Sequence, residues 1–278
     1  MTKSAPAYPA LVKSPMLVPP SGDLDLSKYP TDAAKAKYDK DEAKEKHREN
    51  VKRLAELQEV FYASGEHALL VCIQAMDAGG KDSTIRRCFG GINPQGCRVT
   101  SFKVPTEIER SHDFLWRHHL ACPAKGMIGL HNRSHYETVL IERVKKIAPE
   151  PIWRGRFAHI RHFERILADE GTVIVKLFLH LSKAEQKERL LRRQQRPDKH
   201  WKFNPADLEE RRRWDEYQEA FHEALAETST RDAPWYVVPA DQKWYRDVLV
   251  SDLMVEVMEG LNLKYPEPLP GIEDYEIK

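Results

Sequence analysis

The chain has 278 residues, of which 41% are hydrophobic, and this size and composition fit one α/β domain with appendages. Lys and Arg number 44 against 43 Asp and Glu, so the formal net charge of +1 excludes binding to nucleic acid or anionic membranes through overall charge. No apolar run approaches the ~20 residues of a membrane span, no signal peptide is recognisable, and the four cysteines form no CxxC pair. We therefore expect a cytoplasmic protein.

The N-terminal part of the chain divides into two segments of different character. Residues 1–30 are rich in proline and serine without hydrophobic periodicity, which predicts an extended arm outside the core. Residues 31–63 are helical in pattern and densely charged at first. The sequence thus predicts an arm at 1–30, a single domain at 31–265 and a C-terminal tail at 266–278.

Strand and helix patterns alternate through the domain. The apolar run at 69–75 fits a strand buried on both faces, and a glycine-containing turn at 76–80 follows it. Further strands are predicted at 98–103, 127–130, 172–181 and 235–238. Helices are predicted at 84–89, 107–120, 136–147, around 163–167, and at 183–193, 208–225 and 244–261. This alternation predicts a three-layer α/β fold, with a parallel sheet covered by helices on both faces.

The turn after the first strand has the features of a phosphate-binding loop. A strand, a glycine turn and a helix aim backbone N–H groups and a positive helix end at one point, to which Lys81 adds a cation. Ala75 and Asp82 depart from the strict Walker pattern. Asp77 would repel a phosphate unless a cation stood between them, so we expect it to coordinate Mg²⁺. The alternative is an aspartate that bonds only its own backbone.

A second polar cluster, residues 131–137, follows the third predicted strand at the edge where open α/β sheets bind ligands. Arg133 could clamp a phosphate, while Asn132 and Glu137 could hold Mg²⁺ or its waters. Alternatively, Ser134 and Glu137 form a capping box for the next helix. The two histidines of the cluster, four residues apart, lack the further ligand that a zinc site needs.

A basic segment follows the helix at 183–193. Its cationic residues are Arg189, Arg192, Arg193, Arg196, Lys199 and Lys202. Pro197 interrupts it before a second helix, which predicts a hinged helical lid at about 189–215 that folds over an anion. The same patch with Trp201 could instead stack on single-stranded nucleic acid.

Several segments in series resemble polyphosphate kinase family 2. They are AMDAGGKDSTI from residue 75, SFKVPT at 101–106, DFLWR at 113–117, NRSHYE at 132–137, HWKF at 200–203 and APWYVVPADQKWYR at 233–246. The resemblance implies a fold like that of thymidylate kinase, with a P-loop and an arginine-rich lid. It also implies transfer of the terminal phosphate of inorganic polyphosphate to a nucleotide, reversibly, with Mg²⁺ or Mn²⁺ as the metal.

The NRSHYE segment resembles the third subgroup of that family, which phosphorylates nucleoside monophosphates and diphosphates. His131 and Thr138 depart from the subgroup's usual residues. The resemblance also implies a homodimer or homotetramer without nucleic-acid or membrane partners. Two alternatives stay open: an ATP-dependent nucleoside monophosphate kinase, and a polyphosphate-binding protein without catalytic activity.

The resemblance and the residue patterns together give a set of site residues. Those expected to be catalytic are Asp77, Lys81, Asn132, Arg133 and Arg193. Those expected to bind phosphate or nucleotide are Ala78, Gly79, Gly80, Lys81, Asp82, Ser83, Lys103, Arg117, Arg133, Glu137, Arg189, Arg193 and Lys202. Those expected to hold the metal are Asp77, Asn132 and Glu137.

Overall fold

A parallel five-stranded sheet in the order β2-β3-β1-β4-β5 forms the centre of the computed structural model, which describes residues 11–20 and 22–277. The strands are β1 (Ala68–Gln74), β2 (Cys97–Ser101), β3 (Ile128–Asn132), β4 (Thr172–His180) and β5 (Trp235–Pro239). β1 is buried along its whole length, as its uninterrupted apolar run predicts. Because parallel strands end at the same edge, the segments after β1, β3 and β4 lie close together.

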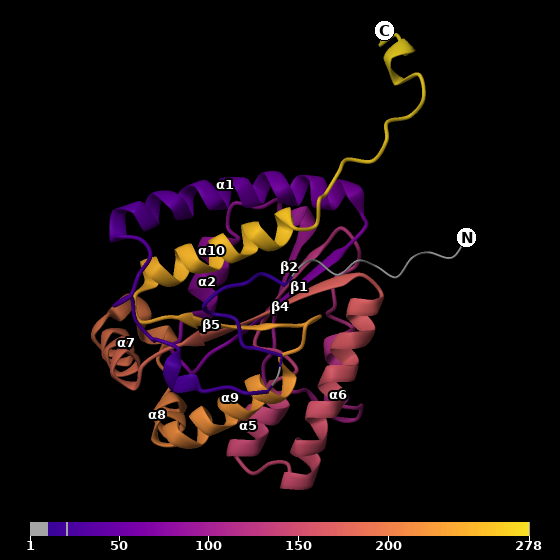
Figure 1. Cartoon of the computed structure of the whole chain (residues 1–278). Helices are drawn as coiled ribbons and strands as arrows, with labels where there is room; N and C mark the ends of the chain where they lie inside the picture. Colours follow the sequence, from indigo (N-terminus) through magenta and orange to yellow (C-terminus); the bar gives the residue numbers. More distant parts are fainter. Residues whose placement is uncertain (1–10, 21, 278) are drawn as a thin grey trace.

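Helices cover both faces of the sheet (Figure 1), so the predicted three-layer α/β fold is confirmed. One layer contains α1 (Lys40–Ser64), α2 (Lys81–Cys88) and α10 (Lys243–Glu259), and the other contains α5 (Glu137–Val144), α6 (Glu150–Asp169) and α9 (Trp214–Thr228). Each layer has its own apolar core against the sheet. None of the helices among the described residues is long and apolar enough to cross a bilayer.

The basic segment forms a helical projection beside the sheet. It comprises α7 (Lys183–Gln195), the 3-10 helix η3 (Pro197–Lys202) and α8 (Ala206–Arg212), after which α9 returns to the domain. Pro197 is the first residue of η3, where its fixed φ and missing N–H are tolerated. The break that the sequence predicts between two lid helices is therefore present.

Two predicted helix boundaries are wrong, and local side chains explain both. α1 begins at Lys40 rather than at residue 31, because Asp39 and Glu42 form a capping box there. The helix predicted at 107–120 is two short helices, α3 (Glu107–Arg110) and α4 (Trp116–His119). The Asp113 carboxylate accepts a hydrogen bond from the Leu115 backbone N–H, a local turn that competes with the helix.

The expectation that the N-terminal segment lies outside the core is wrong for residues 12–18. Val12, Met16 and Val18 are buried, and Leu17 forms an antiparallel bridge with Tyr236 of β5. The Val18 N–H donates to the Trp235 carbonyl at 2.9 Å. The segment thus covers the otherwise open edge of β5, which satisfies backbone groups that an exposed edge strand leaves unpaired.

A fully buried ion pair fixes the turn that follows β3. Lys176 of β4 donates to Glu164 of α6 at 2.7 Å and to the Tyr136 hydroxyl at 2.8 Å. Glu164 also contacts His135 at 3.1 Å. Because His135 and Tyr136 immediately follow Arg133 and Ser134, this network holds the second polar cluster against the sheet.

We expect Lys176→Met to lower the free energy of unfolding by about 3 to 5 kcal/mol, because it leaves the Glu164 carboxylate buried without its cation. Adding Glu164→Gln removes that charge and should recover part of the loss. Urea denaturation of both variants measures the two values. Equal stability of the single variant and the unchanged protein would contradict this account.

Candidate active site

The loop between β1 and α2 curls around the N-terminus of α2. Its backbone takes left-handed conformations at Ala78 (φ 60°) and Gly80 (φ 105°), and the Gly79 N–H donates to the Met76 carbonyl at 2.9 Å. Gly80 is the N-cap of α2, and no side chain caps this end. The first N–H groups of α2 therefore remain available to an anion, and the helix dipole favours negative charge there.

Two side chains of α7 hold the loop in this shape from behind. Gln186 donates to the Asp77 carbonyl at 2.9 Å. The five N–H groups of Arg189 are directed to the carbonyls of Ala78, Gly79, Ala240 and Asp241 and to the carboxylate of Glu185. The sequence assigned Arg189 to phosphate binding, but this guanidinium has no N–H left for a ligand. We therefore treat it as a positioning residue.

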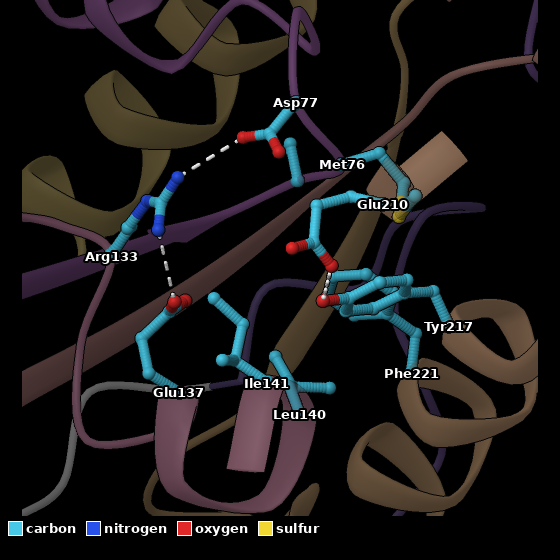
Figure 2. A pocket seen from close by; sticks show the side chains of 10 residues that line it. Met76, Asp77, Arg133, Glu137, Leu140, Ile141, Glu210, Tyr217 and Phe221 are labelled. Atoms are coloured by element: carbon cyan, nitrogen blue, oxygen red, sulfur yellow. Dashed lines mark hydrogen bonds and ion pairs between the residues drawn. The ribbon is translucent and has the colours of Figure 1, made fainter. Parts of the chain in front are cut away.

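Asp77 and Arg133 connect the two predicted polar segments. Arg133 Nη2 donates to Asp77 Oδ1 at 3.0 Å, and Arg133 Nη1 lies 3.3 Å from Glu137 Oε2 (Figure 2). Arg133 has a left-handed backbone (φ 62°), a conformation that costs energy for a residue with a Cβ and recurs at functional sites. Burial raises the pKa of Glu137, although Arg133 opposes this shift. The arginine is thus held between two carboxylates, of which Asp77 is the more exposed.

Lys81 is the cation of the loop itself. Its Nζ donates to the Ala75 carbonyl at 2.9 Å. Burial lowers the pKa of this ammonium, and the nearby charge of Arg133 lowers it further. A bound anion would oppose both effects, because it would stabilise the charged ammonium and so raise its pKa.

Asp82, at the start of α2, contacts residues of two other segments. Asn132 Nδ2 donates to Asp82 Oδ1 at 2.7 Å, and Lys202 Nζ of the lid lies 3.6 Å from Asp82 Oδ2. Burial raises the pKa of Asp82, but the hydrogen bond from Asn132 and the charge of Lys202 outweigh it, so that the pKa lies below its usual range. Asp82 thereby connects the end of β3 to the lid.

The lid holds a carboxylate that the sequence did not single out. Arg193 Nη1 donates to Asp207 Oδ2 at 3.1 Å. Burial, followed by the negative charge of Asp77, raises the pKa of Asp207 to about 6, against the opposing charges of Arg193 and Arg133. Asp207 therefore lies close enough to the loop for the charges of Asp77 and Lys81 to shift its pKa. Asp207 lies in the first turn of α8, where an acidic residue is common, so the sequence gave no pattern from which to infer this role.

Lys103 and Arg117 lie beyond the end of β2. Arg117 Nη1 donates to the Lys103 carbonyl at 2.9 Å, and its guanidinium lies over the Phe102 ring. The Phe102 N–H donates to the Asn132 carbonyl at 3.1 Å, which places the segment that contains Phe102 and Lys103 beside the end of β3. Within the described residues neither cation contacts Asp77 or Arg133.

Neither of the two structural alternatives for the second cluster is found. The Ser134 hydroxyl oxygen accepts hydrogen bonds from Gln74 and the Tyr136 N–H, and no side chain caps α5, so the predicted S-x-x-E capping box is absent. His131 bonds to the Ala121 carbonyl, and His135 bonds to Glu164. Among the described residues, no group of three or more His, Cys, Asp or Glu side chains could hold a metal ion.

A narrow pocket of about 30 Å³ opens beside Asp77 and Arg133, between α5, α8 and α9 (Figure 2). Leu140, Ile141 and Phe221 line it, and the Tyr217 hydroxyl donates to Glu210 at 2.5 Å. The sequence reasoning missed Glu210 and Tyr217, because Tyr217 and Phe221 have the helical spacing of ordinary core residues.

Comparison with known proteins gives consistent matches over nearly the whole domain. The profile described as polyphosphate kinase 2 matches residues 37–266. The AMP/ADP-polyphosphate phosphotransferase of Meiothermus ruber is 53% identical over 90% of this chain and 94% of its own length. The ADP-polyphosphate phosphotransferase of Rhodopseudomonas palustris is 48% identical over 89% and 90%. The crystal structure of polyphosphate kinase 2 from Arthrobacter aurescens TC1 superposes with a TM-score of 0.88 at 39% identity, covering 99% of this chain and 96% of that one.

We expect Arg189→Lys to lower the free energy of unfolding by about 2 kcal/mol, because lysine cannot supply the planar set of five donors. Arg212→Lys, at an exposed site on α8, is the matched control and should change nothing. Thermal denaturation gives the stability, and titration with tripolyphosphate gives the affinity of the loop for an anion. Weaker binding with unchanged stability would instead make Arg189 a direct phosphate ligand.

The raised pKa of Asp207 predicts a pH effect on stability. Between its ordinary value of 3.8 and about 6, the folded protein holds a proton that the unfolded chain has released. The stabilisation from this proton is complete below pH 4 and is lost as the pH rises through 6. We expect the free energy of unfolding to fall by about 1 kcal/mol over this range, once solvent screening is allowed for. Asp207→Asn should remove this slope from denaturation curves measured between pH 4 and 7. Parallel curves for the two proteins would contradict the shift.

Proposed function

Because the chain belongs to the polyphosphate kinase 2 family, we propose that it transfers the terminal phosphate of inorganic polyphosphate to AMP and ADP, yielding ADP and ATP, and that the reaction is reversible. The observation that carries this proposal is the 53% identity to an AMP/ADP-polyphosphate phosphotransferase over 94% of that protein's length. The resemblance also supports a homodimer or homotetramer as the assembled form.

Mg²⁺ is the metal that these residues suit. It keeps several waters and binds through one or two carboxylates together with substrate phosphates, so it needs no cage of protein ligands. Asp77 is the best candidate ligand because its carboxylate is partly exposed beside the loop. Glu137 is a weaker one because burial favours its neutral form, and the Asn132 amide already donates to Asp82. When bound, the metal neutralises charge on the phosphates.

The side chains around the loop supply positioning and charge for an in-line transfer. Arg133 can exchange its contact with Asp77 for two parallel hydrogen bonds to a phosphate, and Lys81 can exchange the Ala75 carbonyl for phosphate oxygens. Arg193 pairs with Asp207, on whose carboxylate the charges of Asp77 and Arg133 also act. Phosphoryl transfer of this kind relies on orientation and electrostatic stabilisation, so no covalent enzyme intermediate is needed.

Incubation of the purified protein with polyphosphate, Mg²⁺ and either AMP or ADP, without ATP, tests the proposed reaction. We expect ADP and ATP from AMP, and ATP from ADP. Turnover of AMP only when ATP is supplied would identify a nucleoside monophosphate kinase instead, and polyphosphate binding without any product would identify a non-catalytic protein.

Replacement of Asp77 by Asn should lower kcat by at least about 100-fold, because the neutral amide lacks the negative charge that binds a cation between the loop and the phosphates. Asp215→Asn, at an exposed position of α9, is the control and should keep full activity. Initial rates at several Mg²⁺ concentrations measure the effect. Full activity of the Asp77 variant at saturating Mg²⁺ would refute this role.

A further inference from the structure

Before it reaches α1, the N-terminal segment crosses the turn between β5 and α10, and we call residues 29–38, which make this crossing, the strap. The Thr31 carbonyl accepts hydrogen bonds from the Ala240 N–H at 3.0 Å and from the Asp241 N–H at 2.8 Å. The Thr31 hydroxyl donates to Asp241 Oδ2 at 2.9 Å. A single residue of the strap thus makes three hydrogen bonds to this turn.

The same turn carries groups that fix the phosphate-binding loop. Arg189 Nη2 donates to the carbonyls of Ala240 and Asp241, while its Nη1 donates to the carbonyls of the loop. Asp241 Oδ1 accepts a hydrogen bond from the N–H of Ser182, the N-cap of α7, at 2.8 Å. One oxygen of the Asp241 carboxylate therefore holds the strap, and the other holds the start of the helix on which Arg189 lies.

The strap is itself bound to the domain on both sides of Thr31. On one side the Tyr29 hydroxyl donates to the Leu17 carbonyl at 2.9 Å, next to β5. On the other side the Tyr38 hydroxyl donates to Asp252 of α10 at 2.9 Å. Because both flanks are held by other elements, Thr31 is placed to restrain the turn.

The loop needs such restraint, and Thr31 can supply it only indirectly. Ala78 has a left-handed backbone, which costs energy for a residue with a Cβ and persists only where surrounding contacts hold it. Within the part of the chain that the structure describes, no hydrogen bond or ion pair joins Thr31 to residues 76–81. Thr31 also lies outside the family profile, whose match begins at residue 37.

We propose that Thr31 is a positioning residue for the binding of the phosphate donor, and that it acts on the loop through Asp241 and Arg189. This inference rests on the proposed function. The strap fixes the turn, the turn presents two carbonyls to Arg189, and Arg189 in turn fixes the carbonyls of Ala78 and Gly79. The N–H groups of the loop are thereby oriented before polyphosphate arrives, which lowers the entropic cost of binding it.

Replacement of Thr31 by Val tests this role, because valine keeps the shape of the side chain and the backbone carbonyl but cannot donate to Asp241. We expect the KM for polyphosphate to rise by about tenfold, which corresponds to the loss of one hydrogen bond to a charged group. The KM for ADP and kcat should change little. Thr31→Ser keeps the hydroxyl and should restore the KM. Thr172→Val, at the first residue of β4 and so at the opposite end of the sheet from the loop, is the matched control and should have no effect.

Calorimetric titration with tripolyphosphate separates positioning from a merely structural role. At a temperature at which circular dichroism shows every variant to be folded, Thr31→Val should weaken the affinity by about tenfold. A loss of stability alone would leave the affinity of the folded protein unchanged. In an Arg189→Lys background, Thr31→Val should have a much smaller effect, because the contact through which the strap acts is already lost.

Three results would overturn the inference. Unchanged donor KM and tripolyphosphate affinity in Thr31→Val would show that the strap does not position the loop. Equal effects of Thr31→Val with and without Arg189→Lys would show that the strap does not act through Arg189. In both cases the unchanged protein still turns over polyphosphate, so the proposed function stands. A wild-type protein inactive with polyphosphate would remove the proposed function and this inference together.

Discussion

The ion pair between Asp77 and Arg133 is the contact on which the rest of the site depends, because it joins the loop after β1 to the turn after β3. The two strands are neighbours, with Ile73 opposite Asn132, so their carboxyl ends meet at one edge of the sheet. The left-handed backbone at Arg133 turns its side chain toward the loop, and the Lys176 network holds the residues that follow. The sheet register, the left-handed backbone at Arg133 and the buried Lys176 network together fix the position of the Arg133 guanidinium.

The site is assembled from cations whose present partners a phosphate can replace. Arg133 is held by carboxylates and Lys81 by a backbone carbonyl. Arg189 differs, because its N–H groups are all directed to the protein and fix the loop. The site therefore contains two kinds of cation, one that fixes the shape of the loop and one whose present contacts a phosphate can replace.

The fold and the centre of the site could be predicted from the sequence because they depend on local patterns. Apolar runs and glycine turns predicted the strands of the central sheet. The motifs around Asp77 and Arg133 fall at strand ends that the parallel sheet brings together. The role of Arg189 could not be predicted, because a sequence does not show that a lid arginine turns toward backbone carbonyls. Packing of Val12 and Met16 on β5 was missed because isolated apolar residues among prolines have no period.

We propose that Asp77 and Arg133 separate when substrates bind, with the carboxylate turning to Mg²⁺ and the guanidinium to phosphate. A crystal structure with Mg²⁺, ADP and a methylene-bridged polyphosphate analogue tests this directly. We expect Asp77 to bind the metal at about 2.1 Å or through one of its waters, and Arg133 to contact a phosphate of the analogue. An intact Asp77 and Arg133 ion pair, with the metal and phosphates bound elsewhere, would contradict it.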